Sequence, residues 1–254
     1  MRCVDVSGLC KRFGGLAALT DVSFQVEHGE VLSLIGPNGA GKTTLFNVMT
    51  GFLRPNRGTV TLVDKDITGR RPHQIASVGM VRTFQLNKLF MGESALENVL
   101  LGLHLSTKAP YLSLRSQNGH SGTSEDLERA QELLEFLGLG VVCHSRASAL
   151  PHGQQRMLGI AVALAAAPKV LLLDEPATGL SEKERTFLMG KIRELRDRGT
   201  SVVLVEHNMR LVMDISDRIV VLDFGKKIAE GAPSAIARNP EVIKAYLGDR
   251  YGDP

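Results

Sequence analysis

The stretch Gly36-Pro-Asn-Gly-Ala-Gly-Lys-Thr-Thr44 decides the fold of this chain of 254 residues. It matches G-x-x-x-x-G-K-[ST], the pattern of a phosphate-binding loop. The apolar run Val31-Leu-Ser-Leu-Ile35 precedes it, and the pattern from Leu45 to Thr50 is helical. The sequence therefore predicts a strand, a glycine-rich loop and a helix, which is the context that this motif requires in order to bind phosphate.

Each residue type in this loop has a chemical reason. Glycines let the backbone curl until several N–H groups point inward at a helix N-terminus, which forms an anion-binding concavity. The Lys42 ammonium supplies a point charge for the β- and γ-phosphates, and the Thr43 hydroxyl is suited to Mg²⁺. A glycine-rich turn that binds nothing is the alternative, but the complete motif favours a nucleoside triphosphate site. The residues expected to hold the triphosphate are Gly36, Pro37, Asn38, Gly39, Ala40, Gly41, Lys42, Thr43 and Thr44.

Composition limits the function classes. Hydrophobic residues make up 43% of the chain and charged residues 22%, which is ordinary for a globular protein. The net charge of +3 is spread along the chain, so no basic patch indicates nucleic-acid binding, although mild positive charge suits a cytoplasmic membrane face.

The longest apolar run, Met157 to Ala167, is too short to span a bilayer, and no signal peptide is recognised before Val4. Cys3, Cys10 and Cys143 lack a C-x-x-C spacing and indicate reduced thiols in the cytosol.

Strand patterns alternate with helical patterns over much of the chain, which predicts an α/β protein with a parallel sheet. Val170–Leu173 and Ser201–Val205 are apolar at consecutive positions, as strands covered on both faces are. From about Leu86 to Gly153 helical patterns dominate, interrupted by the polar stretch Ser106–Ser124. We expect this helical block to be a subdomain inserted on the sheet.

Capping signals mark several helix boundaries. Thr123 with Asp126 and Ser181 with Glu184 form capping boxes at helix starts, and a glycine ends each of these helices. The remaining predicted elements are strands at Val4–Leu9, Val22–Val26, Thr59–Val63, Val78–Phe84, Arg218–Asp223 and Lys227–Glu230, and helices at Leu96–Leu105, Gln154–Ala166, from Asn208, Pro233–Ala237 and Pro240–Leu247.

A second motif, Lys169-Val-Leu-Leu-Leu-Asp-Glu-Pro176, places two carboxylates after a buried strand. Parallel sheets bind ligands at the C-terminal edge of their strands, so Asp174 is placed to hold the Mg²⁺ shell, through water. Glu175 projects differently and is placed to orient or deprotonate an attacking water. A strand followed by a polar cap is the alternative for this segment alone, but the complete phosphate loop upstream favours the functional interpretation.

Three further residues are candidates because of their positions. His207 follows the strand Ser201–Val205 and can donate a hydrogen bond to a γ-phosphate oxygen, although a lone histidine is more often structural. Gln85 ends its own predicted strand, where its amide is suited to Mg²⁺ or to the water. Two interpretations of Phe13 stay open: its ring packs in the core, or it stacks on adenine.

The ordered set of phosphate loop, Gln85, Leu150-Pro-His-Gly-Gln154, Asp174-Glu175 and His207 resembles the nucleotide-binding subunit of an ABC transporter, over essentially the whole chain. The resemblance implies one nucleotide-binding domain, residues 1–254. Its P-loop NTPase (RecA-like) core, residues 1–85 and 158–254, would carry an N-terminal antiparallel β subdomain, and residues 86–157 an inserted helical subdomain with the signature loop. Arg82-Thr-Phe-Gln-Leu-Asn-Lys-Leu-Phe90, residues 205–213 and the tail 242–248 are similar to the ATP subunits of branched-chain amino-acid importers.

The resemblance also implies residue roles. Phe13 would be the adenine-stacking aromatic and residues 36–44 the triphosphate cradle, with Lys42 acting on the phosphates and Thr43, Gln85 and Asp174 at Mg²⁺. Glu175 would be the general base and His207 the γ-phosphate switch. In this family a neighbouring subunit borrows the signature loop, so His152, Gly153 and Gln154 would contact ATP bound to the other chain. ATP then closes a dimer and hydrolysis reopens it.

Three departures from the family pattern bear on the rate and symmetry of hydrolysis. The usual Leu-Ser-Gly-Gly-Gln is Leu150-Pro-His-Gly-Gln154 here, which removes a hydroxyl, and Pro151 has no N–H. Val162 stands where an arginine is common, and Ser181 where an aspartate is usual. None of them argues against ATP binding.

On this resemblance we expect an ATPase subunit, peripheral at the cytoplasmic face of the inner membrane, that drives uptake of amino acids, foremost leucine, isoleucine and valine. Expected partners are two transmembrane permease subunits, a second identical or different ATP-binding subunit and an extracytoplasmic solute-binding protein, with no nucleic acid. Importers of amides, urea or other polar solutes and exporters of lipid or lipopolysaccharide share much of the pattern and stay open.

Two more distant classes fit less well. ABC ATPases that act on DNA or ribosomes usually carry long coiled-coil insertions or tandem domains. A P-loop GTPase needs Asn-Lys-x-Asp, which Asn87-Lys-Leu-Phe90 does not match.

Overall fold

The computed structural model describes residues 2–83, 89–103 and 123–247. Its strands are β1 (Arg2–Phe13), β2 (Leu16–Glu27), β3 (Val31–Ile35), β4 (Arg57–Leu62), β5 (Lys65–Asp66), β6 (Met80–Arg82), β7 (Val170–Asp174), β8 (Ser201–Val205), β9 (Arg218–Asp223) and β10 (Lys226–Gly231). Its helices are α1 (Lys42–Met49), α2 (Pro72–Ser77), α3 (Ala95–Leu103), α4 (Ser124–Phe136), α5 (His152–Ala165), α6 (Glu182–Asp197), α7 (Met209–Ile215), α8 (Pro233–Ile236) and α9 (Pro240–Leu247), with short 3₁₀ turns η2 (Gly140–Val142) and η3 (Ala147–Ala149).

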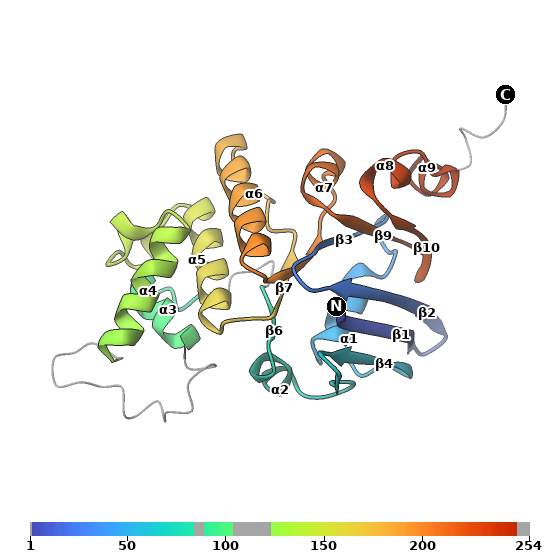
Figure 1. Cartoon of the computed structure of the whole chain (residues 1–254), viewed down its shortest axis with the longest axis horizontal. Coiled ribbons are helices and arrows are strands. Elements are labelled where there is room, and N and C mark those ends of the chain that lie inside the picture. The colour runs from blue at the N-terminus through green and yellow to red at the C-terminus, as the bar shows by residue number, and fades with distance from the viewer. Residues whose placement is uncertain (1, 84–88, 104–122, 248–254) are drawn as a thin grey trace.

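The larger of the two sheets in the described residues has the strand order β10-β9-β3-β8-β7-β6. Its five strands from β9 to β6 pair in parallel, and β10 adds an antiparallel edge. Every residue of β3, β7 and β8 is buried, because helices cover one face of the sheet and α1 with the N-terminal strands covers the other (Figure 1). The parallel α/β core that the apolar runs predict is therefore confirmed.

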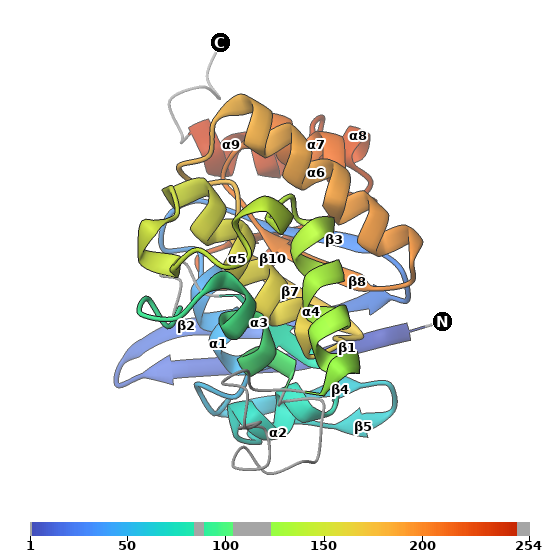
Figure 2. The same ribbon diagram turned by 90° about the vertical axis from the view of Figure 1, so that its left-hand side faces the viewer.

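The second sheet is antiparallel, with the order β2-β1-β4-β5. Its inner face, α1 and one face of the larger sheet share a hydrophobic cluster that includes Phe24, Leu34, Phe46 and Val203. The N-terminal strands therefore form the antiparallel β subdomain that the family resemblance implies. They lie below the larger sheet in Figures 1 and 2, opposite α6, α7, α8 and α9.

Helices α3, α4 and α5 gather at one end of the molecule (Figure 1). Their apolar faces join Leu171, Leu173 and Leu204 of the sheet in one hydrophobic cluster. At Gly102 in α3 an added Cβ would lie 2.5 Å from the carbonyl oxygen of Val162, so α3 and α5 approach closely there. Helix α5 runs through residues 157 and 158, where the predicted boundary of the helical subdomain falls, and that division stays a prediction.

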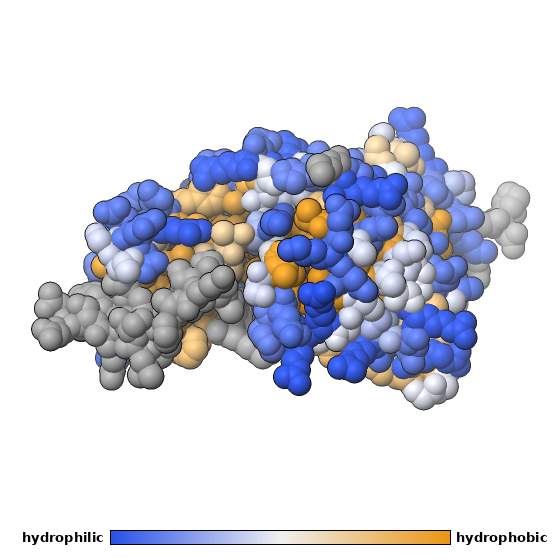
Figure 3. Space-filling view, turned by 60° about the horizontal axis from the view of Figure 1, so that its bottom comes forward, coloured by the Kyte–Doolittle hydropathy of each residue, from blue (hydrophilic) through white to orange (hydrophobic). Residues whose placement is uncertain are grey.

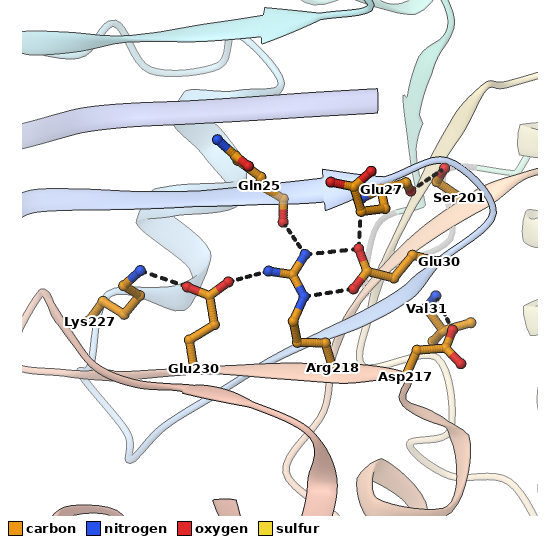
Figure 4. A network of polar contacts seen from close by, with 9 residues as sticks. All are labelled: Gln25, Glu27, Glu30, Val31, Ser201, Asp217, Arg218, Lys227 and Glu230. Atoms are coloured by element: carbon orange, nitrogen blue, oxygen red, sulfur yellow. Dashed lines mark hydrogen bonds and ion pairs between the residues drawn. The ribbon is translucent and has the colours of Figure 1, made fainter. Parts of the chain in front are cut away.

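A partly buried ion-pair network joins the two sheets (Figure 4). Arg218, at the start of β9, donates to both carboxylate oxygens of Glu30 at 2.8 and 2.9 Å and to the carbonyl of Gln25 in β2 at 2.7 Å. It also contacts Glu230 of β10, which accepts from Lys227 at 2.6 Å. The hydrogen bonds from Arg218 to Glu30 raise the pKa of the guanidinium above its usual value. Arg218 therefore links β2, β9, β10 and the turn before β3.

The structure differs from the sequence prediction mainly at short elements. Helix α2 was not predicted; Pro72 begins it, and the Gln74 side chain accepts from the backbone N–H of Arg71. The predicted strand Val78–Phe84 is confirmed only over Met80–Arg82, and Phe84 lies outside the described residues. Most of the polar stretch 106–124 lies outside them too.

The surface and the helix lengths agree with the composition. The face shown in Figure 3 is mostly hydrophilic, with a small hydrophobic group of side chains near its centre. Within the part of the chain that the structure describes, none of the helices is both long enough and apolar enough to cross a membrane.

Candidate functional site: a triphosphate cavity

The phosphate loop leaves no room for side chains at two of its glycines. Gly36 has φ +150°, and an added Cβ would lie 2.1 Å from the carbonyl oxygen of Leu222. Gly41 has φ +101°, and its Cβ would lie 2.8 Å from the carbonyl oxygen of Ala18. Both positions require glycine because the loop is pressed against the strands around it.

Helix α1 begins directly after Gly41 with no side chain capping its N-terminus. Its first N–H groups have no partner within the helix and are available to an anion. The Lys42 ammonium donates to the carbonyls of Gly36 and Pro37 at 2.6 and 3.0 Å, so carbonyl groups of the loop fix the position of this positive charge. Burial lowers the pKa of Lys42, and the carboxylates of Glu175 and Asp174 oppose that shift.

A cavity of about 410 Å³ opens beside this helix terminus. Its lining includes the loop from Asn38 to Thr44 together with Phe13, Glu175 and Phe224. Phe13 is 46% exposed, so packing in the core, one of its two interpretations, is wrong. Lys11 lies with its Nζ 5.2 Å from the centre of the Phe13 ring. The structure thus brings the N-terminal aromatic, the phosphate loop and the carboxylate of Glu175 to one cavity.

Glu175 and His207 meet at the C-terminal edge of the larger sheet. His207 Nδ1 lies 3.9 Å from Glu175 Oε1, and both side chains reach solvent. Glu175 has φ +46°, a left-handed conformation that costs a non-glycine residue about 1–3 kcal/mol. Its N–H donates to the carbonyl of Val205 at 2.9 Å, which helps to hold that conformation. Strain of this kind clusters at functional sites.

Asp174 forms a buried ion pair that the sequence did not predict. Arg82 Nη2 donates to Asp174 Oδ2 at 2.7 Å, and the side chains of Arg82 and Asp174 are 6% and 4% exposed. Arg82 Nη1 donates to Asn47 of α1 at 2.6 Å. The pair therefore ties β6, β7 and α1 together beneath the phosphate loop.

The oxygen donors present fit Mg²⁺ by their chemistry, because hydroxyl and carboxylate oxygens are ligands that this ion prefers. Thr43 lines the cavity. Asp174, which ends β7, does not line it, and its carboxylate is 4% exposed and paired with Arg82. In the described ranges no group of three or more histidine, cysteine or acidic residues is placed to hold a metal by itself. Phosphate oxygens would have to complete the coordination. Gln85, the remaining predicted ligand, lies outside the described residues.

The signature residues do not lie in this cavity. His152, Gly153 and Gln154 form the first turn of α5 and are not among the residues that line it. A Cβ added at Gly153 would lie 2.0 Å from Glu184 Oε1, and one added at Gly179 would lie 3.3 Å from the His152 ring. The first turn of α5 is therefore packed against the start of α6, with His152 exposed.

Four residues of the site were missed at the sequence level. Arg82 begins the stretch that resembles the branched-chain importer subunits, but no role was predicted for it. Phe224 belonged to no motif and is 85% exposed with φ +41° at the turn between β9 and β10. Arg156 is a charged residue on an otherwise apolar helix face, and Glu206 is a charged residue directly after a buried strand. Both are buried, at 6% and 2% exposure. A charged residue at an otherwise apolar position was the sequence signal that could have identified Arg156 and Glu206.

Comparisons with known proteins show the family of this chain. Residues 19–178 match a family model described as "ABC transporter", and residues 226–252 match one described as "Branched-chain amino acid ATP-binding cassette transporter". The chain is 45% identical over 249 residues to the high-affinity branched-chain amino acid transport ATP-binding protein LivG of Escherichia coli (strain K12), covering 97% of this chain and 98% of that protein. It is 44% identical to BraF of Pseudomonas aeruginosa, which carries the same description, with the same coverage.

Solved structures agree with the fold. An ATP-binding cassette of an ABC transporter in its ADP conformation superposes with a TM-score of 0.87 at 34% identity, covering 98% of this chain and 100% of that one. A second cassette, solved as a dimer in a post-hydrolysis state with ADP and phosphate, superposes with a TM-score of 0.78 at 26% identity, covering 91% and 98%.

Proposed function

Because this chain belongs to the ABC transporter family of ATP-binding proteins, we propose that it is the ATP-hydrolysing subunit of an importer for branched-chain amino acids. The observation that carries the substrate class is the match of residues 226–252 to the branched-chain family model, together with the full-length similarity to LivG and BraF. Nothing in the cavity selects an amino acid, since the transported solute does not enter an ATP-binding subunit.

The cavity supports a mode of ATP binding. The N–H groups of the loop and of α1 would surround the phosphates, and Lys42 would turn from the carbonyls of Gly36 and Pro37 to the β- and γ-phosphates. Phe13 lines the cavity with an exposed ring, as an aromatic that stacks on adenine must. Thr43 and Asp174, with Gln85, are the residues that would hold Mg²⁺, which when bound neutralises phosphate charge.

Glu175 and His207 support a mode of hydrolysis. Glu175 lines the cavity and carries the carboxylate that would accept the proton of the attacking water. His207, 3.9 Å away from it, would donate to a γ-phosphate oxygen and so respond to the presence of that phosphate. The two groups are brought together because Glu175 directly follows β7 and His207 follows β8, and these strands are neighbours in one sheet.

Two copies of an ATP-binding subunit would complete each site. His152, Gly153 and Gln154 lie at the N-terminus of α5, away from the cavity of their own chain, where they would face ATP held by a partner. Two transmembrane subunits would dock on the helical end formed by α3, α4 and α5, and an extracytoplasmic protein would deliver the solute. The chain would thus sit at the cytoplasmic face of the inner membrane as a peripheral subunit.

Uptake of radiolabelled leucine, isoleucine and valine at low concentration tests the proposal. Cells carrying Lys42→Ala in place of this protein should lose this uptake, because the loop loses its charge for the phosphates. Glutamate uptake in the same cells is the control and should not change.

Unchanged branched-chain uptake, in cells in which other importers of these amino acids are deleted, would contradict the proposed substrate class. ATP hydrolysis would then be measured separately, because it does not depend on which solute is transported.

A further inference from the structure

Glu206 is a buried carboxylate next to the proposed catalytic centre. It directly follows β8 and exposes only 2% of its surface. Burying a carboxylate is costly unless hydrogen bonds and opposite charge compensate it. Glu206 is not among the residues that line the triphosphate cavity, so contact with a phosphate does not explain its presence.

The two oxygens of Glu206 hold two different loops. Oε1 accepts from the backbone N–H of Ala177 at 2.9 Å, in the loop that follows β7 and begins with Glu175. Oε2 accepts from the backbone N–H of His207 at 3.2 Å, in the loop that follows β8. Because a carboxylate is small and planar, these bonds set the spacing between the loop of Glu175 and the loop of His207.

Arg156 of α5 supplies charge to the same place. Arg156 as a whole is 6% exposed, and its Nη1 donates to the carbonyl of Glu175 at 3.1 Å. Burial lowers the pKa of Arg156, and Glu206 is the strongest of the carboxylates that counteract this, ahead of Glu175 and Asp174. Arg156 thus ties α5 to the backbone of Glu175, and the Glu206 carboxylate belongs to the electrostatic surroundings of its guanidinium.

Together these contacts frame the strained backbone of Glu175. Its N–H is held by Val205, its carbonyl by Arg156, and the loop two residues later by Glu206. Arg156 lies on the helix that begins with His152, so the frame also reaches the signature loop.

We propose that Glu206 is a positioning residue that sets the geometry of Glu175 and His207 for ATP hydrolysis and, with Arg156, ties that geometry to α5. This inference rests on the proposed function, because positioning has a meaning only if Glu175 and His207 act on ATP. Movement of α5 during association with a second chain would then be transmitted to the catalytic loop through Arg156.

The test is ATP hydrolysis by the full-length chain carrying Glu206→Gln. The amide keeps the shape of the side chain but offers one acceptor oxygen in place of two and no charge toward Arg156. We expect kcat to fall about tenfold or more, while the KM for ATP changes less than about threefold, since the phosphate loop is untouched. A general loss of structure would instead change both constants and the melting temperature.

Asp214→Asn is the matched control. It removes the same charge from α7, where the side chain is 65% exposed and paired with Arg193. Its kcat should stay within about twofold of wild type, because exposed ion pairs contribute little. Glu206→Asp keeps both oxygens and the charge but withdraws them by one methylene, and should give a kcat between those of wild type and Glu206→Gln.

The double variant Arg156→Met, Glu206→Gln covers the case in which Glu206→Gln does not fold, because it leaves no unpaired buried charge. It too should show the reduced kcat. A wild-type kcat in either folded variant would overturn the positioning role while leaving the proposed function intact. A wild-type chain that binds ATP but never hydrolyses it, alone or with its transport partners, would overturn both.

Discussion

At the scale of single residues, Phe13 shows how position gives a common side chain a role. Its ring is 46% exposed at the edge of the triphosphate cavity, where leaving it in water has no structural benefit. Phe224 lines the same cavity with an even more exposed ring. An aromatic face at this place offers a stacking surface to a nucleobase.

We expect Phe13→Ala to raise the KM for ATP about tenfold with little change in kcat, because stacking on a base contributes about 1–3 kcal/mol and acts equally in the ground and transition states. Steady-state ATPase kinetics measure both constants. Phe13→Tyr should keep the wild-type KM. Phe52→Ala is the control, since Phe52 is 47% exposed but does not line the cavity. An unchanged KM for ATP in Phe13→Ala would show that Phe13 does not contribute to ATP binding.

Ser181, one of the departures from the family pattern, has a local explanation. Its hydroxyl accepts from the N–H of Glu184 and donates to the Glu184 carboxylate at 2.7 Å, which completes the capping box of α6. These bonds lower the pKa of Glu184 below its usual value. A serine at this position therefore stabilises the start of α6, against which Gly153 packs.

At the scale of elements, the ion-pair network around Arg218 fixes the antiparallel sheet on the larger sheet. The network matters for function because Phe13, at the end of β1, is carried by one sheet and the phosphate loop by the other. The Arg218 and Glu30 side chains are only 25% and 10% exposed, so water replaces their contacts poorly.

We expect Arg218→Met to lower the free energy of unfolding by about 2–4 kcal/mol, because it leaves the carboxylate of Glu30 buried without its cation. Urea unfolding followed by circular dichroism measures this change. Arg193→Met breaks the exposed pair with Asp214, whose side chains are 39% and 65% exposed, and should cost less than about 1 kcal/mol. Equal losses in the two variants would show that the network contributes no more than a surface pair.

At the scale of the whole molecule, the proposed function requires a second chain to complete the site. The triphosphate cavity and the signature residues His152, Gly153 and Gln154 lie on different parts of the same chain. A related cassette has been solved as a dimer with ADP and phosphate. In the proposed function, association of two ATP-binding subunits would provide the change in shape that a transporter needs.

We expect Glu175→Gln to bind ATP normally and to hydrolyse it about 10²–10⁴-fold more slowly, because the general base is lost. The variant should accumulate as a dimer when ATP is added and stay monomeric with ADP, as measured by light scattering after gel filtration. If the ATP partner is a different chain, the dimer will form only when that chain is present.

Lys42→Ala, which weakens phosphate binding, is the control and should stay monomeric with either nucleotide. Near-normal turnover of ATP by Glu175→Gln would show that Glu175 is not the general base.

Local signals predicted much of the secondary structure. The apolar runs gave β3, β7 and β8, and the capping boxes gave the starts of α4 and α6, because caps and consecutive buried residues depend on nearby sequence. The C-terminal helix α9 has the predicted bounds Pro240–Leu247. Elements without strong local signals, such as α2 and the short strand β5, were not predicted.

The sequence by itself determined the phosphate loop, the alternation of the main strands and helices, and the carboxylates at the end of β7. These depend on spacings within a few residues, where glycine conformation, capping and apolar periodicity act directly. Only the tertiary structure decided that Arg82 pairs with Asp174, 92 positions away, that Glu206 is buried between two loops, and that Phe13 lies in the cavity rather than the core. Such contacts form between segments far apart in the chain, and their strength depends on burial, which exists only once the sheets and helices have packed.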